Sequence, residues 1–177
     1  MQCMSRFFSL VLFSCGALLA QAPNALVSEA KFPWTVVRDN LLKMAEKMPE
    51  ENYSFKPVPE LQSFSQRVAH IAGANLSVCQ GLLGGQAPRP AAAASKPELI
   101  ALLQQSSAAC DSVFDSLSDA AALEKVSSRL GGPFPPEQTR TKLATLNNMV
   151  RHSNEMYGYM SVYLRLKGIV PPSSAPE

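Results

Sequence analysis

The chain has two histidines, His70 and His152, and they are the residues whose type and position best suit chemistry. His152 lies in the stretch RHSNEMYGYM, residues 151–160, where Met156 follows it by four positions. On a helix these two side chains stand one above the other on the same face. A helical histidine with a second donor one turn later is a common beginning of a metal site, so this stretch resembles half of one.

The helical face around His152 is rich in sulfur and aromatic rings. It carries Met149, Met156, Tyr159, Met160 and Tyr163, with Asn148 and Glu155 beside it. Several thioethers around one imidazole suit a soft ion such as Cu(I). The alternative is ordinary packing, because methionine is flexible and apolar and fills the cores of helical bundles.

His70 falls on the polar side of a second predicted helix. By the 3.6-residue period, the apolar residues gather on the opposite side: Val68, Ile71, Ala72, Leu76, Cys79 and Leu83. The neighbours of His70 on its own side are small or polar: Ser63, Arg67, Gly73, Ala74 and Ser77. We therefore expect His70 to face a groove or solvent rather than the core, and a plain surface histidine is the alternative.

Four helices are predicted to position these residues. Helical periodicity and end signals place them at about 28–48, 63–83, 96–117 and from 136–138 to 167. Ser95 and Glu98 form a capping box for the third helix, and Gly84–Gly85 and Gly168 end the second and fourth. Residues 118–137 are predicted to be irregular, and no strand pattern of useful length occurs. The fold class predicted is all-α, an up-down four-helix bundle.

The N-terminal residues have the pattern of a secretory signal peptide. Arg6 precedes the apolar run Phe7–Ala20, which is too short to span a bilayer comfortably. We expect cleavage after Ala20, export to the periplasm or medium, and no transmembrane span in the mature chain. Lipid attachment at Cys15, within a loose lipobox Leu12–Cys15, is the alternative. The domain organisation expected is then a signal peptide over 1–20, a bundle over 21–172 and a disordered tail over 173–177.

Charge, motifs and cysteine content exclude several classes of function. The chain of 177 residues has a formal net charge of +2 and no Lys/Arg cluster, which argues against a nucleic-acid partner. No glycine-rich phosphate loop, CxxC pair or nucleophile motif is present. Cys79 and Cys110 would remain after export. They can pair in an oxidising compartment, but we expect two small buried apolar side chains.

Two longer stretches resemble the DinB-like (DinB/YfiT) four-helix superfamily. The run MPEENYSFKPVPELQSFSQRVAHIAGAN, residues 48–75, resembles a block that ends in a metal-binding histidine. The run LNNMVRHSNEMYGYMSVYLRLKGIVPPSS, residues 146–174, resembles the last helix of that family. The resemblance covers nearly all of the mature chain, in the order and at the separation that the family has.

The resemblance implies a bundle, often dimeric, with a divalent-metal site made by three histidines. By position the first two ligands fall on His70 and His152, and the third falls on Met156, where this chain departs from the family pattern. A thioether is a poor ligand for Zn²⁺ or Ni²⁺. Glu155 stands three positions after His152 and could complete a His₂-carboxylate set.

The function expected is therefore an exported DinB-like protein with an altered pocket for a divalent metal ion of the zinc or nickel type. If the protein is an enzyme, we expect a metal-dependent hydrolase or a thiol-type transferase acting on a small molecule that the sequence does not identify. The alternatives are a binding module for a small ligand or a soft metal such as copper, or a bundle with a vestigial site that serves interactions, for example as a homodimer.

Overall fold

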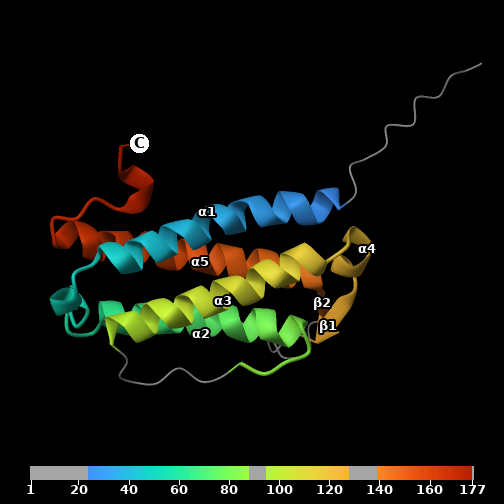
Figure 1. Ribbon diagram of the computed structural model, residues 1–177, viewed down its shortest axis with the longest axis horizontal. Helices are drawn as coiled ribbons and strands as arrows, with labels where there is room; N and C mark the ends of the chain where they lie inside the picture. Colours follow the sequence, from blue (N-terminus) through green and yellow to red (C-terminus); the bar gives the residue numbers. More distant parts are fainter. Residues whose placement is uncertain (1–23, 88–94, 128–138, 177) are drawn as a thin grey trace, which may run out of the picture.

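Four long helices pack side by side in the computed structural model, which describes residues 24–87, 95–127 and 139–176 (Figure 1). They are α1 (Ala25–Lys47), α2 (Phe64–Leu82), α3 (Lys96–Ser116) and α5 (Lys142–Leu166). In cross-section α1 contacts α3 and α5, and α2 contacts the same two helices. The prediction of a bundle of four long helices is confirmed. Helices α1 and α2 lie at opposite corners of this bundle.

The helices do not alternate in direction along the chain, so the predicted up-down order is wrong. Lys96, at the start of α3, donates hydrogen bonds to the carbonyl oxygens of Glu46 and Met48 at the end of α1, at 2.9 and 2.8 Å. Because α2 begins at that same end, α2 and α3 run in parallel (Figure 1). The thirteen residues 83–95 can reach about 43 Å when extended, more than the roughly 32 Å length of α3, so loop length did not forbid this crossover.

Local capping signals explain how α2 and α3 begin. Ser63 and Gln66 form a reciprocal capping box at the start of α2, and Ser95 and Glu98 form another at the start of α3. Each box satisfies backbone N–H groups that a helix start leaves unpaired. Both helices therefore begin within one residue of the predicted positions.

The other two long helices begin elsewhere than predicted. Helix α1 starts at Ala25 rather than near Ser28, since the N–H groups of Leu26 and Val27 donate to the carboxylate of Asp119, at 3.2 and 3.1 Å. Helix α5 starts at Lys142, where Thr141 accepts a hydrogen bond from the Ala144 N–H. The cap of α1 thus comes from a residue more than ninety positions away, which a local pattern does not reveal.

The connection between α3 and α5 is more regular than predicted. It contains the short helix α4 (Asp119–Ala122) and two three-residue strands, β1 (Lys125–Ser127) and β2 (Thr139–Thr141). The strands pair antiparallel, with Lys125 opposite Thr141. Strands this short carry too few residues to show an alternating pattern. The remaining residues of that connection, 128–138, lie outside the described part of the chain.

The C-terminal residues fold back onto the bundle as the 3₁₀ turn η2 (Pro172–Ser174), which contacts α1. Tyr157 and Ser173 exchange hydrogen bonds, and Arg165 donates to the Ser174 hydroxyl at 3.0 Å. The disorder expected from residue 173 onward is therefore not found at these two serines. Gly168, at φ 71°, ends α5 as predicted.

A single apolar core fills the bundle, and a disulfide crosses it. Cys79 of α2 and Cys110 of α3 are both fully buried, and they form a disulfide with a Cα–Cα distance of 5.0 Å. The expectation of two unpaired buried cysteines is thus wrong about the pairing and right about the burial. One residue expected on the apolar side of its helix is exposed: Leu83, directly after α2.

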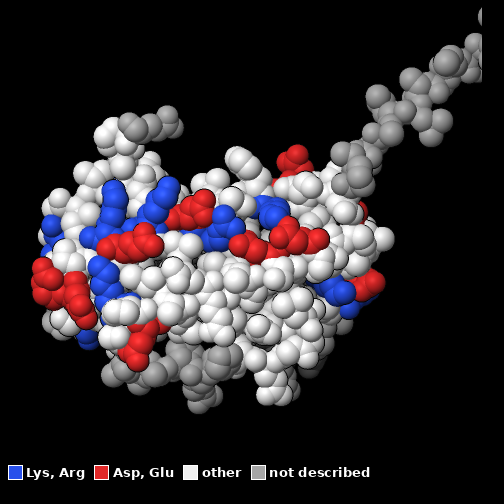
Figure 2. All heavy atoms as spheres, in the orientation of Figure 1, with Lys and Arg blue, Asp and Glu red and all other residues white. Residues whose placement is uncertain are grey.

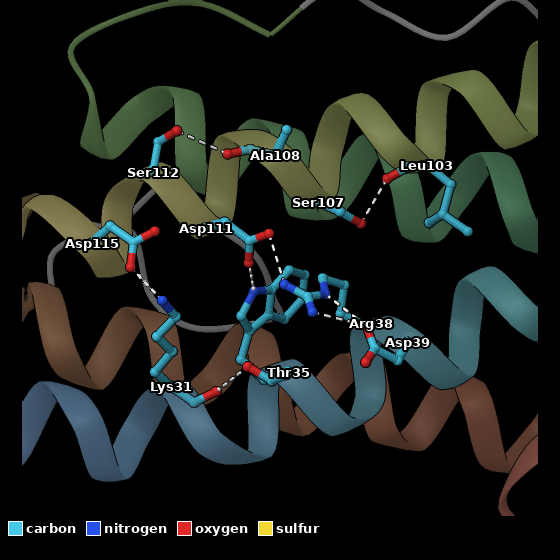
Figure 3. Close-up of polar contacts among 11 residues, drawn as sticks. Lys31, Thr35, Arg38, Asp39, Leu103, Ser107, Ala108, Asp111, Ser112 and Asp115 are labelled. Carbon is cyan, nitrogen blue, oxygen red and sulfur yellow. Dashed lines mark hydrogen bonds and ion pairs between the residues drawn. The ribbon is translucent and has the colours of Figure 1, made fainter.

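Charged side chains gather along the α1 side of the molecule (Figure 2). There Asp111 of α3 accepts hydrogen bonds from Trp34 Nε1 at 2.8 Å and from Arg38 Nη1 at 2.7 Å. Lys31 and Asp115 form an ion pair one turn away, as Figure 3 shows. Every charged group in this network, which we call the α1–α3 network, has a partner of opposite charge.

No helix in the described residues is long and apolar enough to cross a membrane. The predicted signal peptide and the lipobox cysteine lie within residues 1–23, outside the described part of the chain. Their role stays a prediction.

Candidate functional site

The two histidines meet across the α2–α5 contact. Their Nε2 atoms lie 3.2 Å apart, although His70 and His152 are 82 positions apart in the chain. The ring centroids are 5.2 Å apart and the ring planes are tilted by 70°. His70 is exposed and His152 is half-buried, so the pair lies at the surface and not in the core, as the periodicity of α2 predicted for His70.

Buried contacts on either side hold the two helices in this register. Ser153, next to His152, donates a hydrogen bond to Asn75 Oδ1 at 3.0 Å in the core. Farther along the same contact, the sulfur of Met149 on α5 lies 3.4 Å from the sulfur of Cys79 and 3.5 Å from that of Cys110. Because the disulfide ties α2 to α3 as well, α2 is fixed on two sides close to the histidine pair. The imidazoles are therefore positioned by packing of their helices.

The surroundings favour the neutral form of both imidazoles. Partial burial, and then the positive charge of Arg67, lower the pKa of His70. Burial first and His70 second lower the pKa of His152, with Arg151 and Arg67 adding to the effect and Glu155 opposing it. A neutral imidazole has a nitrogen lone pair, which is the form that binds a metal ion. At neutral pH one Nε2 can donate to the other, or both can bind a third atom.

Glu155 points along the surface of α5. It is exposed, accepts a hydrogen bond from the Tyr159 hydroxyl at 3.2 Å and lies 3.6 Å from Arg151 Nη1. The described residues include no group of three or more His, Cys, Asp or Glu side chains placed to hold a metal ion. A carboxylate at this position would have to leave Arg151 and Tyr159 to join the two histidines.

Met156 is buried beside the histidine pair, with a cation next to its sulfur. Its side chain is 6% exposed, and Arg67 Nη1 lies 3.5 Å from Sδ. Arg67 stands one turn before His70 on α2, and its Nε is buried without a hydrogen-bond partner among the described residues. The position that corresponds to a third ligand thus holds a neutral thioether with a guanidinium against it.

The remaining sulfur-bearing residues of the predicted face belong to the core. Met149 contacts the disulfide, and Met160 is fully buried. Tyr159, in contrast, is 51% exposed. The methionine-rich face is therefore mostly packing, with Met156 as the thioether beside the histidines.

The sequence reasoning missed Arg67 as a residue of this site. From the sequence, Arg67 was named only as one of the polar neighbours of His70. The spacing of three residues between Arg67 and His70, which puts both on one face of the helix, was the signal that could have identified it. It also missed Asn75 and Ser153, whose buried hydrogen bond has no sequence signature because the partners lie 78 positions apart.

The geometry of the two imidazoles suits a shared ion. Two nitrogens bound to one tetrahedral zinc ion at ~2.05 Å lie ~3.3 Å apart, and the observed separation is 3.2 Å. The third position fits less well, because thioethers bind zinc poorly and the Arg67 charge repels a cation. The residues present thus fit two of the three bonds of such a site.

Comparisons with known proteins agree with this arrangement at the level of the fold. A family model described as the DinB superfamily matches residues 34–160. The structure is similar to a DinB-like protein from Bacillus cereus ATCC 10987, with a TM-score of 0.66, 17% identity, and coverage of 82% of this chain and 95% of that one. It is also similar to a conserved protein from Enterococcus faecalis, with a TM-score of 0.57, 11% identity, and coverage of 78% and 96%. No curated protein matches the chain in sequence.

Proposed function

Because the chain belongs to the DinB superfamily, we propose that His70 and His152 bind one divalent metal ion of the zinc or nickel type through their Nε2 atoms. The single observation that carries this proposal is the 3.2 Å separation of those atoms. Lowered pKa values of both rings support it, since fewer protons then compete with the ion.

The affinity of this site should lie well below that of a site with three imidazoles. Met156 supplies a weak donor at best, and Arg67 places a positive charge at the same position. Water would fill the coordination positions that the protein leaves open. When bound, a divalent ion supplies a Lewis acid that lowers the pKa of a bound water or thiol.

Glu155 is the residue that can complete the site. It follows His152 by three positions, and its present partners are exposed. Exposed ion pairs contribute about 0.2–1 kcal/mol, so leaving Arg151 costs little. A rotation of Glu155 toward the histidines would give the His₂-carboxylate set found in open catalytic zinc sites.

We propose further that the mature protein acts outside the cytoplasm. The disulfide between Cys79 and Cys110 supports this, because disulfides persist mainly in oxidising compartments. An exported protein is separated from the cytosolic pool of small thiols. Any reaction at this site is therefore better matched to metal-dependent hydrolysis than to thiol transfer.

Zinc titration of protein purified from the periplasm tests the metal proposal. Calorimetry should give about one zinc ion per chain. His70→Ala and His152→Ala should each abolish measurable binding, while Glu155→Gln should weaken it if Glu155 supplies the third bond. Arg165→Gln, a change far along α5, is the matched control and should leave binding unchanged. Absence of zinc binding in the folded wild-type protein would contradict the proposal.

The reciprocal change Met156→His should restore the ligand set that the family pattern implies. We expect zinc affinity to rise about tenfold or more, because a third imidazole replaces a thioether. Combining it with Arg67→Met should raise the affinity again, since the neighbouring positive charge is gone. An unchanged affinity in both variants would mean that residue 156 does not face the ion.

A further inference from the structure

A pocket opens between the first turns of α2, the segment that precedes α2, and the second half of α5. Its volume is about 440 Å³, within the range of small-molecule sites. Its walls are formed by Pro57, Leu61, Arg67, Tyr159, Val162 and Tyr163. Of these six described residues only one is charged, and the others are mostly apolar. The shape and lining suit a ligand with an apolar body.

The charged residue of this wall, Arg67, lacks a carboxylate partner among the described residues. Its guanidinium carbon lies 5.8 Å from the centre of the Tyr159 ring, and within the described part of the chain its Nη1 has one hydrogen-bond partner, the sulfur of Met156. Its Nε is buried and unbonded. A thioether is a weak acceptor, so most N–H groups of the Arg67 guanidinium have no strong acceptor among the described residues. Four other cations of the described chain do have acidic partners: Lys31, Arg38, Lys142 and Arg151.

The other polar atoms of the wall are already engaged. The Tyr163 hydroxyl donates to the Gln62 carbonyl oxygen at 2.8 Å, and the Tyr159 hydroxyl donates to Glu155. Glu155 itself is next to Arg151, which offsets its charge. Arg67 is thus the group in this wall that remains available to a ligand.

Arg67 also connects the pocket to the histidine pair. It precedes His70 by three residues, which is about 4.5 Å along a helix axis. Its charge acts on both imidazoles and contributes to the lowered pKa of each. A ligand held by Arg67 would therefore be bound by a residue one turn before His70 on the same helix.

We propose that this pocket binds a small molecule that combines one carboxylate with an apolar or aromatic body, and that Arg67 takes the carboxylate. A planar guanidinium matches a carboxylate with two parallel hydrogen bonds. A single arginine and otherwise apolar walls favour a monoanion over a phosphate group with two charges. This inference extends the proposed function by naming a class of substrate. Any reaction of that substrate at a bound metal ion rests on the proposed function.

Binding of 2-naphthoate and its neutral isostere 2-naphthamide, measured by calorimetry, tests the inference in both metal-free and zinc-loaded protein. The acid should bind at least about tenfold more tightly than the amide, as expected for charge-assisted hydrogen bonds. Arg67→Met should remove this preference by weakening the binding of the acid much more than that of the amide. Arg165→Met removes the same charge from α5 at a residue outside the pocket wall, and it should keep the preference.

A second variant guards against misfolding of the first. Val162→Trp, at a half-exposed position of the pocket wall, should block both ligands without removing any charge. Equal binding of acid and amide to the wild-type protein, or a preference that survives Arg67→Met, would overturn the inference.

The same data separate this inference from the metal proposal. Zinc binding that depends on both histidines, together with naphthoate binding that depends on zinc and not on Arg67, would refute the inference alone. Naphthoate binding that depends on Arg67 in a protein that takes up no zinc would refute the metal proposal alone.

Discussion

Two helix contacts differ in whether their polar side chains have partners. They are the contact between α1 and α3 and the contact between α2 and α5. In the α1–α3 network, Asp111 joins Trp34 and Arg38, and Lys31 is paired with Asp115 (Figure 3). At the α2–α5 contact, two imidazoles face each other and Arg67 has no carboxylate partner among the described residues. The amide nitrogen of Asn75, buried in the core between these helices, also has no hydrogen-bond partner in the part of the chain that the structure describes.

This difference separates groups that stabilise the bundle from groups available for binding. Buried polar groups in folded proteins are nearly always hydrogen-bonded, because leaving one unpaired costs about 1–3 kcal/mol. The Arg67 Nε has no hydrogen-bond partner among the described residues and therefore calls for an explanation, and a ligand held by the same guanidinium supplies one. This contrast supports the proposal that ligands bind at the α2–α5 contact.

The largest expected effect concerns the disulfide, which links the site helix α2 to α3. The double variant Cys79→Ala, Cys110→Ala should lower the free energy of unfolding by about 3–4 kcal/mol, as expected for a crosslink that closes a loop of this length; the two cysteines are 31 positions apart. Urea denaturation of oxidised, reduced and variant protein measures this. A stability that does not respond to reduction would contradict a closed disulfide in the folded protein.

The second effect tests the structural side. Asp111→Ala should lower the free energy of unfolding by about 2–3 kcal/mol, because the buried Trp34 Nε1 and the Arg38 guanidinium both lose their partner. Asp115→Ala is the matched control at the exposed pair with Lys31, and it should cost less than about 1 kcal/mol. Neither change should alter zinc binding. Equal losses in the two variants would contradict the contrast between buried and exposed pairs.

The third effect is an increase in stability, expected for a substitution of Arg67 at the α2–α5 contact. Arg67→Met removes a partly buried, unpaired guanidinium while keeping an apolar stem, so it should raise stability by up to about 1 kcal/mol. The same variant should lose the preference for naphthoate. A marked loss of stability would show that Arg67 belongs to the structural framework, as Arg38 does.

The smallest effect is the pH dependence of the histidine pair. Both pKa values are lowered in the folded state, chiefly by burial. The unfolded chain therefore binds more protons than the folded one below the ordinary histidine pKa of about 6.5. Stability is complete above that pH and falls as the pH drops through the lowered folded values.

Replacing His70 by Gln should reduce this acid-induced loss of stability, because one of the two titrating rings and its repulsion of the other are removed. Urea midpoints at pH 7.5 and pH 5 for the wild-type and variant proteins provide the comparison. An identical loss in both would mean that other groups cause the acid sensitivity.

Much of the fold and part of the site could be predicted from residues close together in the chain. The capping boxes at Ser63 and Ser95 and the stop at Gly168 are short patterns, and the structure contains each of them. The same holds for the spacing of His152 and Met156 on one helix. The meeting of His70 with His152 was expected from the family resemblance, since periodicity alone placed His70 only at a groove or in solvent.

Other features could not be predicted because they depend on partners far apart in the chain. Asp119 caps α1 from 92 to 93 positions away, and Arg67 lies against a sulfur 89 positions away. The pairing of Cys79 with Cys110 depends on how closely α2 approaches α3. Helix direction belongs to the same class, because the segment between α2 and α3 is long enough for either course.

The sequence by itself determined that four long helices form, where α2 and α3 begin and which residues can donate to an ion, because these follow from periods of a few residues and from side-chain chemistry. Only the tertiary structure decided that α2 runs parallel to α3, that Glu155 lies along the surface and that Arg67 faces the pocket without a carboxylate. These depend on distances between helices, which are set by the packing of the whole core.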